Sequence, residues 1–318
     1  MSKPLIPAFT FGRKVYGKLL GRPRPIALPP PAYTGAAASA FIREKLAGDQ
    51  PVMISRFGSV ELECVVNYIQ QKGGIKKYVD YVQGRSDAFW WKDETLKSMS
   101  NNAGFFPASE PLLEKFSELM LADMQCIDVL GSWRNEERFF EKELSTAVRL
   151  NLADLEPYYH ANPWSEILTG KKVLVIHPFE ASILHQYPKR KALFADQRIL
   201  PDFELKTIKA VQSIANSKTG FKDWFEALEF MKAQVDATDF DIAIIGCGAY
   251  GLPLAAHVKR IGKKAVHLGG ATQLLFGIMG RRWEDNDRIM KMVNASWVKP
   301  LPAETPDNFK NVEEGTYW

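Results

Sequence analysis

Short apolar runs alternate with amphipathic stretches along most of the chain. The runs predict buried strands at residues 51–55, 126–130, 172–177, 203–208, 241–245 and 265–268, because each is apolar and too short for a helix. Apolar residues at helical spacing predict helices at residues 36–46, 60–69, 87–102, 110–124, 135–150, 181–194, 221–234 and from 252 onward. This order predicts an α/β, Rossmann-like fold with a mostly parallel sheet flanked by helices.

The same pattern divides the chain into three parts. Residues 36–280 carry the alternation and are expected to form one Rossmann-like domain, with 36–165 and 166–280 as its halves. Residues 1–35 form a basic, proline-rich leader, since residues 1–43 contain seven Lys or Arg and no acid. Residues 281–318 are charged and then proline-rich with little periodicity, and are expected to be a C-terminal surface extension.

The cysteines and the absence of long apolar runs indicate the cellular compartment of the protein. Cys64, Cys126 and Cys247 are scattered and lack CxxC spacing, so the sequence supports neither a disulfide framework nor a thiolate zinc site. A reducing compartment is therefore expected, and with no apolar run of membrane-spanning length and no secretory signal the predicted location is the cytoplasm.

The basic excess of the chain lies in the leader. The cations there surround Phe9, Phe11, Tyr16, Leu19 and Leu20. This mixture fits either a solvated tail or peripheral contact with the anionic inner face of a membrane. Nucleic acid is not an expected partner, because the excess of positive charge does not lie on the folded body.

A polar cluster follows the first predicted strand. It reads Ser55-Arg56-Phe57-Gly58-Ser59-Val60-Glu61 and ends in the first turn of the next helix. The planar fork of Arg56 suits phosphate oxygens, and Gly58 lets the backbone approach a ligand. Glu61 is the candidate general base, although a carboxylate there also stabilises the helix N-terminus.

A glycine-rich turn follows a later strand. Gly246-Cys-Gly248-Ala-Tyr-Gly251 has the spacing of GxGxxG between a strand and a helix, where backbone amides can bind phosphate. The next strand ends in Gly269-Gly270 and not in the acid that an NAD ribose requires. A turn that only packs helix against sheet remains an alternative.

Weaker candidates stand at other strand ends. His177 closes a strand at the expected ligand crevice, and Gln273 follows Gly269 at the start of a helix. His267 lies inside a strand and is expected to be structural. The chain lacks a GxSxG elbow, an HExxH motif and a Walker A loop.

The cluster Arg56-Phe57-Gly58-Ser59-Val60-Glu61 resembles the R-[FY]-G-D-G-E signature of the GT-D-type glycosyltransferases, a bacterial family. Residues 241–251 and 263–273 are similar in pattern to later units of that family. The resemblance implies a sugar-nucleotide site in which Glu61 acts with a neighbouring Asp in metal binding and acceptor activation. Ser59 stands in place of that Asp, so a Mn or Mg ion implied by the resemblance loses a carboxylate ligand here.

The sequence thus predicts a glycosyltransferase that moves a sugar from a nucleotide sugar, expected to be UDP-linked, to a glycan acceptor of a surface polysaccharide or glycoprotein, with lipid-linked acceptors included. Glu61 is the expected base. The expected donor-binding residues are Arg56, Gly58, Ser59, His177, Gly246, Gly248, Gly251, Gly269 and Gln273. Two alternatives stay open, namely an NAD(P)-dependent oxidoreductase that uses residues 246–251 and a non-catalytic nucleotide-binding protein.

Overall fold

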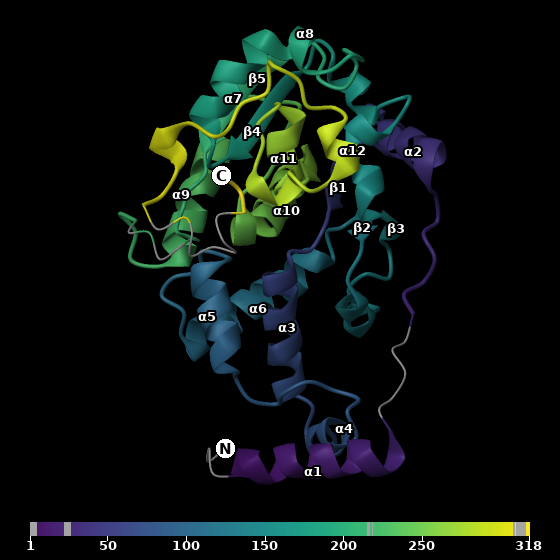
Figure 1. Cartoon of the computed structure of the whole chain (residues 1–318), viewed down its shortest axis with the longest axis vertical. Coiled ribbons are helices and arrows are strands. Elements are labelled where there is room, and N and C mark those ends of the chain that lie inside the picture. The colour runs from purple at the N-terminus through teal and green to yellow at the C-terminus, as the bar shows by residue number, and fades with distance from the viewer. Residues whose placement is uncertain (1–4, 22–26, 215–216, 218, 308, 310–315) are drawn as a thin grey trace.

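A computed structural model of the chain describes residues 5–21, 27–214, 217, 219–307, 309 and 316–318 (Figure 1). Within these residues, seven strands form one sheet in which all neighbours are parallel, which confirms the predicted fold class. Across the sheet the order is β3 (Val148–Asn151), β2 (Val129–Ser132), β1 (Val52–Ser55), β7 (Lys264–His267), β6 (Ile242–Ile245), β4 (Lys172–His177) and β5 (Glu204–Lys209).

Helices cover both faces of this sheet (Figure 1). The α-helices of the described residues are α1 (Ile6–Leu20), α2 (Gly35–Ala47), α3 (Ser59–Gln71), α4 (Lys76–Val82), α5 (Asp93–Asn101), α6 (Glu110–Met124), α7 (Glu180–Gln186), α8 (Arg190–Leu193), α9 (Trp224–Asp236), α10 (Gly251–Arg260), α11 (Ala271–Leu275) and α12 (Asp287–Met290). None of them is long and apolar enough to cross a membrane.

The core has two layers because strand residues alternate between the two faces of the sheet. On one face, Met53, Ile176 and Ile245 are buried beneath α3, α6, α9 and α10. On the other face, Ile54 and Val175 are buried beneath α2, α7 and α11. Strands that are apolar on both faces explain why the sequence shows continuous apolar runs there.

The helix predicted at residues 135–150 is wrong. Residues 135–150 do not form one helix but a short 3-10 helix, η2 (Asn135–Phe140), followed by a turn and the edge strand β3. The cause is Glu137, whose buried carboxylate accepts hydrogen bonds from the N–H groups of Trp133 and Arg134 at 2.9 and 3.0 Å and so closes a tight turn.

Most of the described part of the leader is helical and packs on the rest of the protein. Its residues 6–20 form α1, which packs on α4 through Phe9, stacked on Tyr78 with 5.2 Å between ring centroids. Arg13 of α1 donates to the carbonyl oxygen of Ser86 at 2.7 Å. Three leader cations, Lys3, Arg22 and Arg24, lie outside the described residues.

The order of the strands creates a crevice at one edge of the sheet. From β1 the chain adds β2 and β3 on one side, places β4 and β5 on the other, and then fills the gap with β6 and β7. The carboxyl ends of β1, β7, β6 and β4 therefore lie side by side. Ligands bind in α/β proteins at such a reversal of strand order, beyond the carboxyl ends of the strands.

Candidate functional site

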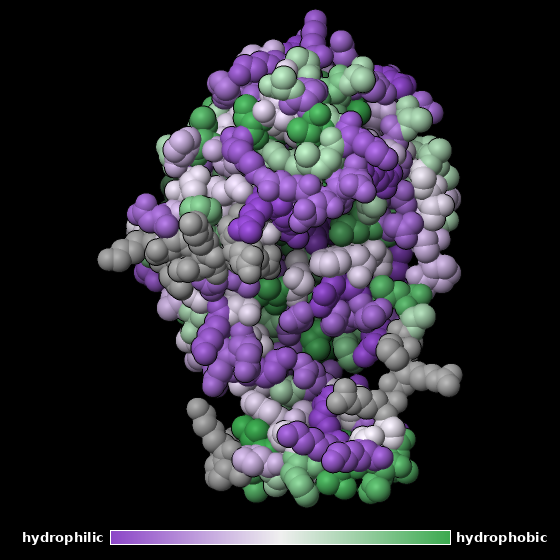
Figure 2. Space-filling model, in the orientation of Figure 1, coloured by the Kyte–Doolittle hydropathy of each residue, from purple (hydrophilic) through white to green (hydrophobic). Residues whose placement is uncertain are grey.

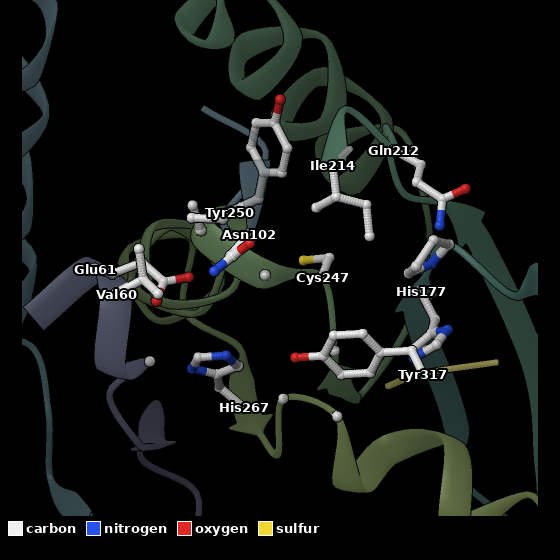
Figure 3. A pocket seen from close by; sticks show the side chains of 18 of the residues that line it. Val60, Glu61, Asn102, His177, Gln212, Ile214, Cys247, Tyr250, His267 and Tyr317 are labelled. Atoms are coloured by element: carbon white, nitrogen blue, oxygen red, sulfur yellow. The ribbon is translucent and has the colours of Figure 1, made fainter. Parts of the chain in front are cut away.

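One pocket lies above these four strand ends (Figure 3). Nine of the ten predicted site residues line it, and only Gly251 does not. Figure 3 shows Glu61 and His267 on one side of the pocket, and His177 and Gln212 on the opposite side. The crevice expected from the strand ends is therefore a real cavity, and it gathers the nine predicted residues from four separate chain segments.

Arg56 comes directly after β1, and its side chain lines the wall of the pocket. Its guanidinium carbon lies 5.0 Å from the centroid of the Trp133 ring, and its Nε is buried without a hydrogen-bond partner in the described part of the chain. Burial lowers the pKa of Arg56, while the nearby Tyr317 and Glu61 raise it. A buried donor that lacks an acceptor is costly, and an anion in the pocket would supply one.

Glu61 lies in the first turn of α3, with 8% of its surface exposed. Its carboxylate folds back over Gly58, where a Cβ would lie 1.9 Å from Oε2. Gly58 has φ −75° and ψ 144°, a conformation that any residue adopts. The position therefore needs a glycine because a side chain there would collide with Glu61, and not because of its backbone conformation. Ser59 begins α3 and also lines the pocket.

Glu63, the second carboxylate of this segment, faces elsewhere. Its Oε1 accepts a hydrogen bond from Nη2 of Arg134 at 2.7 Å, and the Glu63 side chain is about half exposed. Glu63 does not line the pocket.

The glycine-rich turn forms the floor of the pocket between β6 and α10. Gly248 has φ +55°, and residues 248–250 form the 3-10 helix η8 that precedes α10. The first N–H groups of such a helical turn have no acceptor within it, and here they belong to a segment that lines the pocket.

The flanking glycines of this turn serve packing. A Cβ on Gly246 would lie 2.5 Å from the carbonyl oxygen of Gly269, and one on Gly251 would lie 2.2 Å from Nε2 of His267. Gly251 thus lets α10 approach β7, as the third glycine of a GxGxxG turn does. Of the predicted site residues, Gly251 accommodates His267 and does not line the pocket.

Two buried histidines border the pocket. Nδ1 of His177 accepts a hydrogen bond from the N–H of Phe179 at 2.9 Å, so the neutral ring carries its proton on Nε2. Nδ1 of His267 lies 3.0 Å from the hydroxyl oxygen of Ser55. Burial lowers the pKa of each histidine to about 3, and for His267 the charge of Arg56 adds to the shift. Both are neutral near pH 7.

Gly269 and Gln273 form the wall beneath β7. Gly269 has φ +62°, and a Cβ there would lie 2.8 Å from Nη1 of Arg56. Nε2 of Gln273 donates to the carbonyl oxygens of Ile278 and Tyr317 at 3.2 Å each, whereas its Oε1 has no partner in the described residues. Gln273 therefore anchors the chain segment that closes the pocket.

The sequence missed the contribution of residues 281–318, which were expected on the surface. Arg282, Tyr317 and Trp318 line the pocket. The guanidinium carbon of Arg282 lies 5.2 Å from the centroid of the Tyr317 ring, and Figure 3 shows the Tyr317 hydroxyl pointing toward the middle of the cavity. Glu304 fixes this segment, because its buried carboxylate accepts a hydrogen bond from the N–H of Ala181 at 2.7 Å at the start of α7.

Trp133, Asn102 and Gln212 are further pocket residues that no sequence motif singled out. The Trp133 indole N–H donates to the carbonyl oxygen of Phe57 at 3.0 Å, which holds the ring beside Arg56. In Figure 3 the side chain of Asn102 points toward Glu61. Tertiary packing brings these residues to the pocket, and no local sequence motif marks them as site residues.

The donor set does not fit a divalent metal ion held by the chain. No group of three or more His, Cys, Asp or Glu side chains within the described ranges is arranged to bind one. Ser59 replaces a carboxylate beside Glu61, and Glu63 is paired with Arg134.

Comparison with known proteins finds no match for the chain among family models, curated proteins or solved structures.

Proposed function

We propose that this protein is a glycosyltransferase that moves a sugar from a nucleoside diphosphate to a hydroxyl group of a glycan. The observation that carries the proposal is the meeting of Arg56, Glu61 and the turn at residues 246–251 in one pocket at the strand ends. A cation and backbone amides suit a diphosphate, and a shielded carboxylate beside them suits an attacking hydroxyl.

Two guanidinium groups support the diphosphate part of the proposal. Arg56 and Arg282 both line the pocket, and they lie close enough that the charge of Arg282 lowers the pKa of Arg56. Two neighbouring cations repel each other, so a dianionic ligand between them would relieve that repulsion. The neutral Nε2–H of His177 is a further donor at the pocket edge.

The proposed step is a single displacement. The acceptor oxygen forms a bond to the anomeric carbon, the bond from that carbon to the diphosphate oxygen breaks, and the acceptor proton passes to the Glu61 carboxylate. Arg56 and the amides of residues 248–249 stabilise the negative charge that develops on the leaving diphosphate. No step is assigned to a metal ion, because the residues of the pocket do not form a site for one.

The family suggested by the resemblance supplies the substrate classes. We propose a UDP-linked donor and an acceptor glycan of a surface polysaccharide or glycoprotein, lipid-linked acceptors included. The cluster at Arg56–Glu61 supports this assignment because it keeps four positions of the signature.

One observation favours a second candidate. Arg56 packs against Gly269 at the end of β7, next to the strand that carries the GxGxxG turn. In dinucleotide-binding folds, an arginine at that strand end accommodates the 2′-phosphate of NADP. The competing function is therefore an NADP-linked oxidoreductase, since an NAD-linked enzyme would need an acid there.

Thermal-shift measurements with UDP, GDP, CMP, NADH and NADPH distinguish these functions, since a ligand that binds only the native state raises the melting temperature. A shift with a nucleoside diphosphate that disappears in Arg56→Ala supports the transferase. A shift with NADPH alone overturns it in favour of the oxidoreductase. Binding of a diphosphate without turnover of any nucleotide sugar supports the non-catalytic alternative.

A further inference from the structure

The outer face of α1 is an unusual surface for a folded protein. Phe11 is 69% exposed and Leu19 is 77% exposed, with Val15 between them. These residues are spaced by four along the helix and so share one face. Figure 1 shows α1 at the end of the molecule farthest from α8, and Figure 2 shows apolar side chains gathered at that end.

The opposite face of α1 is already occupied. Phe9 packs on Tyr78 and Phe89, with ring centroids 5.2 Å apart in each pair. The guanidinium carbon of Arg13 lies 4.6 Å from the centroid of the Tyr81 ring, and Arg13 donates to the carbonyl oxygen of Ser86. These contacts hold the helix in place, so its apolar outer face is presented outward.

The positive charges beside the outer face of α1 indicate what this face binds. Lys14 and Lys18 are exposed and border the stripe formed by Phe11, Val15 and Leu19, and residues 5–21 contain no acid. Lysines that flank an apolar stripe extend their ammonium groups to lipid phosphates while the stripe enters the acyl region. A protein partner would require acidic groups of matching shape, whereas an anionic lipid surface requires only this pattern.

We propose that the outer face of α1 docks the protein on the surface of an anionic phospholipid membrane. The helix lies parallel to the surface, with its Phe11–Leu19 side inserted and its lysines at the headgroups. Helix α3 runs from the pocket at Ser59 to the region of α4 beside α1, a length of about 20 Å at 1.5 Å per residue. The docked protein therefore holds its pocket about one helix length from the lipid.

Flotation with vesicles tests the proposal on the full chain. Wild-type protein is expected to bind vesicles of phosphatidylcholine mixed with phosphatidylglycerol, to bind phosphatidylcholine alone more weakly, and to lose binding as salt rises. Phe11→Ser with Leu19→Ser should reduce the partition coefficient by about tenfold or more, because two apolar side chains no longer insert. Lys14→Gln with Lys18→Gln should reduce it by about fivefold for each lysine.

The matched control is Phe230→Ser with Leu184→Ser, which removes a phenylalanine and a leucine that are each 49% exposed on other helices. This variant should bind vesicles as wild type does, and so should Glu61→Gln, which separates the test from that of the proposed catalysis. Melting temperatures close to that of wild type show that the α1 variants remain folded.

Three results would overturn the proposal. The first is a wild-type protein that does not float with anionic vesicles at low salt. The second is an equal loss of binding in the control and the α1 variants. The third is self-association that the α1 variants abolish while vesicle binding is unchanged, which would assign the face to a second copy of the chain.

Discussion

Gly58→Ala tests the catalytic assignment of Glu61 by displacing its carboxylate without removing any polar group from the pocket. Alanine adopts φ −75° and ψ 144° without strain, so the change should not disturb the start of α3. The new Cβ would lie 1.9 Å from Oε2 of Glu61 and 2.5 Å from its carboxyl carbon. The flexible carboxylate must therefore move.

The displacement sets the size of the effect. Ordinary contacts to a Cβ begin at 3.4 Å, so Oε2 of Glu61 has to shift by about 1.5 Å from its 1.9 Å position. A misplacement of about 1 Å in a reacting group costs roughly 100-fold in rate. We expect kcat to fall by about 100-fold, with KM for the donor changed by no more than a few-fold. Stability should change by less than about 1 kcal/mol, since the loss of chain entropy in the unfolded state offsets a poorer helix cap.

The assay is steady-state transfer from a labelled nucleotide sugar, with urea unfolding as the measure of stability. Gly220→Ala is the matched control, because no atom lies within 4 Å of a Cβ there. The double variant Gly58→Ala/Glu61→Gln should have the activity of Glu61→Gln alone, since both changes act on the same carboxylate. Wild-type turnover in Gly58→Ala, or a further large loss in the double variant, would contradict the assignment of Glu61 as the base.

Three further predictions concern other residues that line the pocket. Gly269→Ala forces an alanine into φ +62° against Arg56, so the free energy of unfolding should fall by about 1–2 kcal/mol in urea titrations, and no loss would contradict the geometry. Arg56→Lys keeps the charge but loses the planar fork, so calorimetry should show diphosphate affinity reduced about tenfold, and unchanged affinity would remove Arg56 from the site. His177 and His267 have pKa values of about 3 in the folded protein against 6.5 for an ordinary histidine, so the unfolded chain binds more protons as pH falls below 6.5. Stability should therefore decrease from pH 6.5 toward pH 3, by up to about 1.4 kcal/mol per pH unit for each histidine, and urea unfolding of His177→Gln should show a shallower slope than wild type.

The sequence predicted the central elements because their signals are local. Residues 110–124 and 172–177 match α6 and β4 at both ends, since apolar residues at helical spacing and a short apolar run are signals that need no distant partner. The strand ends then brought nine predicted site residues together through topology alone.

The sequence predictions that differ from the structure concern segments whose conformation depends on contacts with distant parts of the chain. The expected helix at residues 87–102 begins only at Asp93, because the Asn67 side chain donates to the carbonyl oxygens of Ala88 and Trp90 and holds that segment extended. The placement of Tyr317 in the pocket depends on Gln273, which lies 44 residues away. No periodicity in residues 281–318 encodes that contact.

The most direct test of the central claim is transfer by Glu61→Gln compared with wild type, using a nucleotide sugar whose diphosphate binds the protein. We expect the variant to bind the diphosphate within a few-fold of wild-type affinity and to transfer sugar about 100-fold to 10,000-fold more slowly, because the amide cannot accept the proton of the acceptor. Unchanged turnover in Glu61→Gln would exclude Glu61 as the general base.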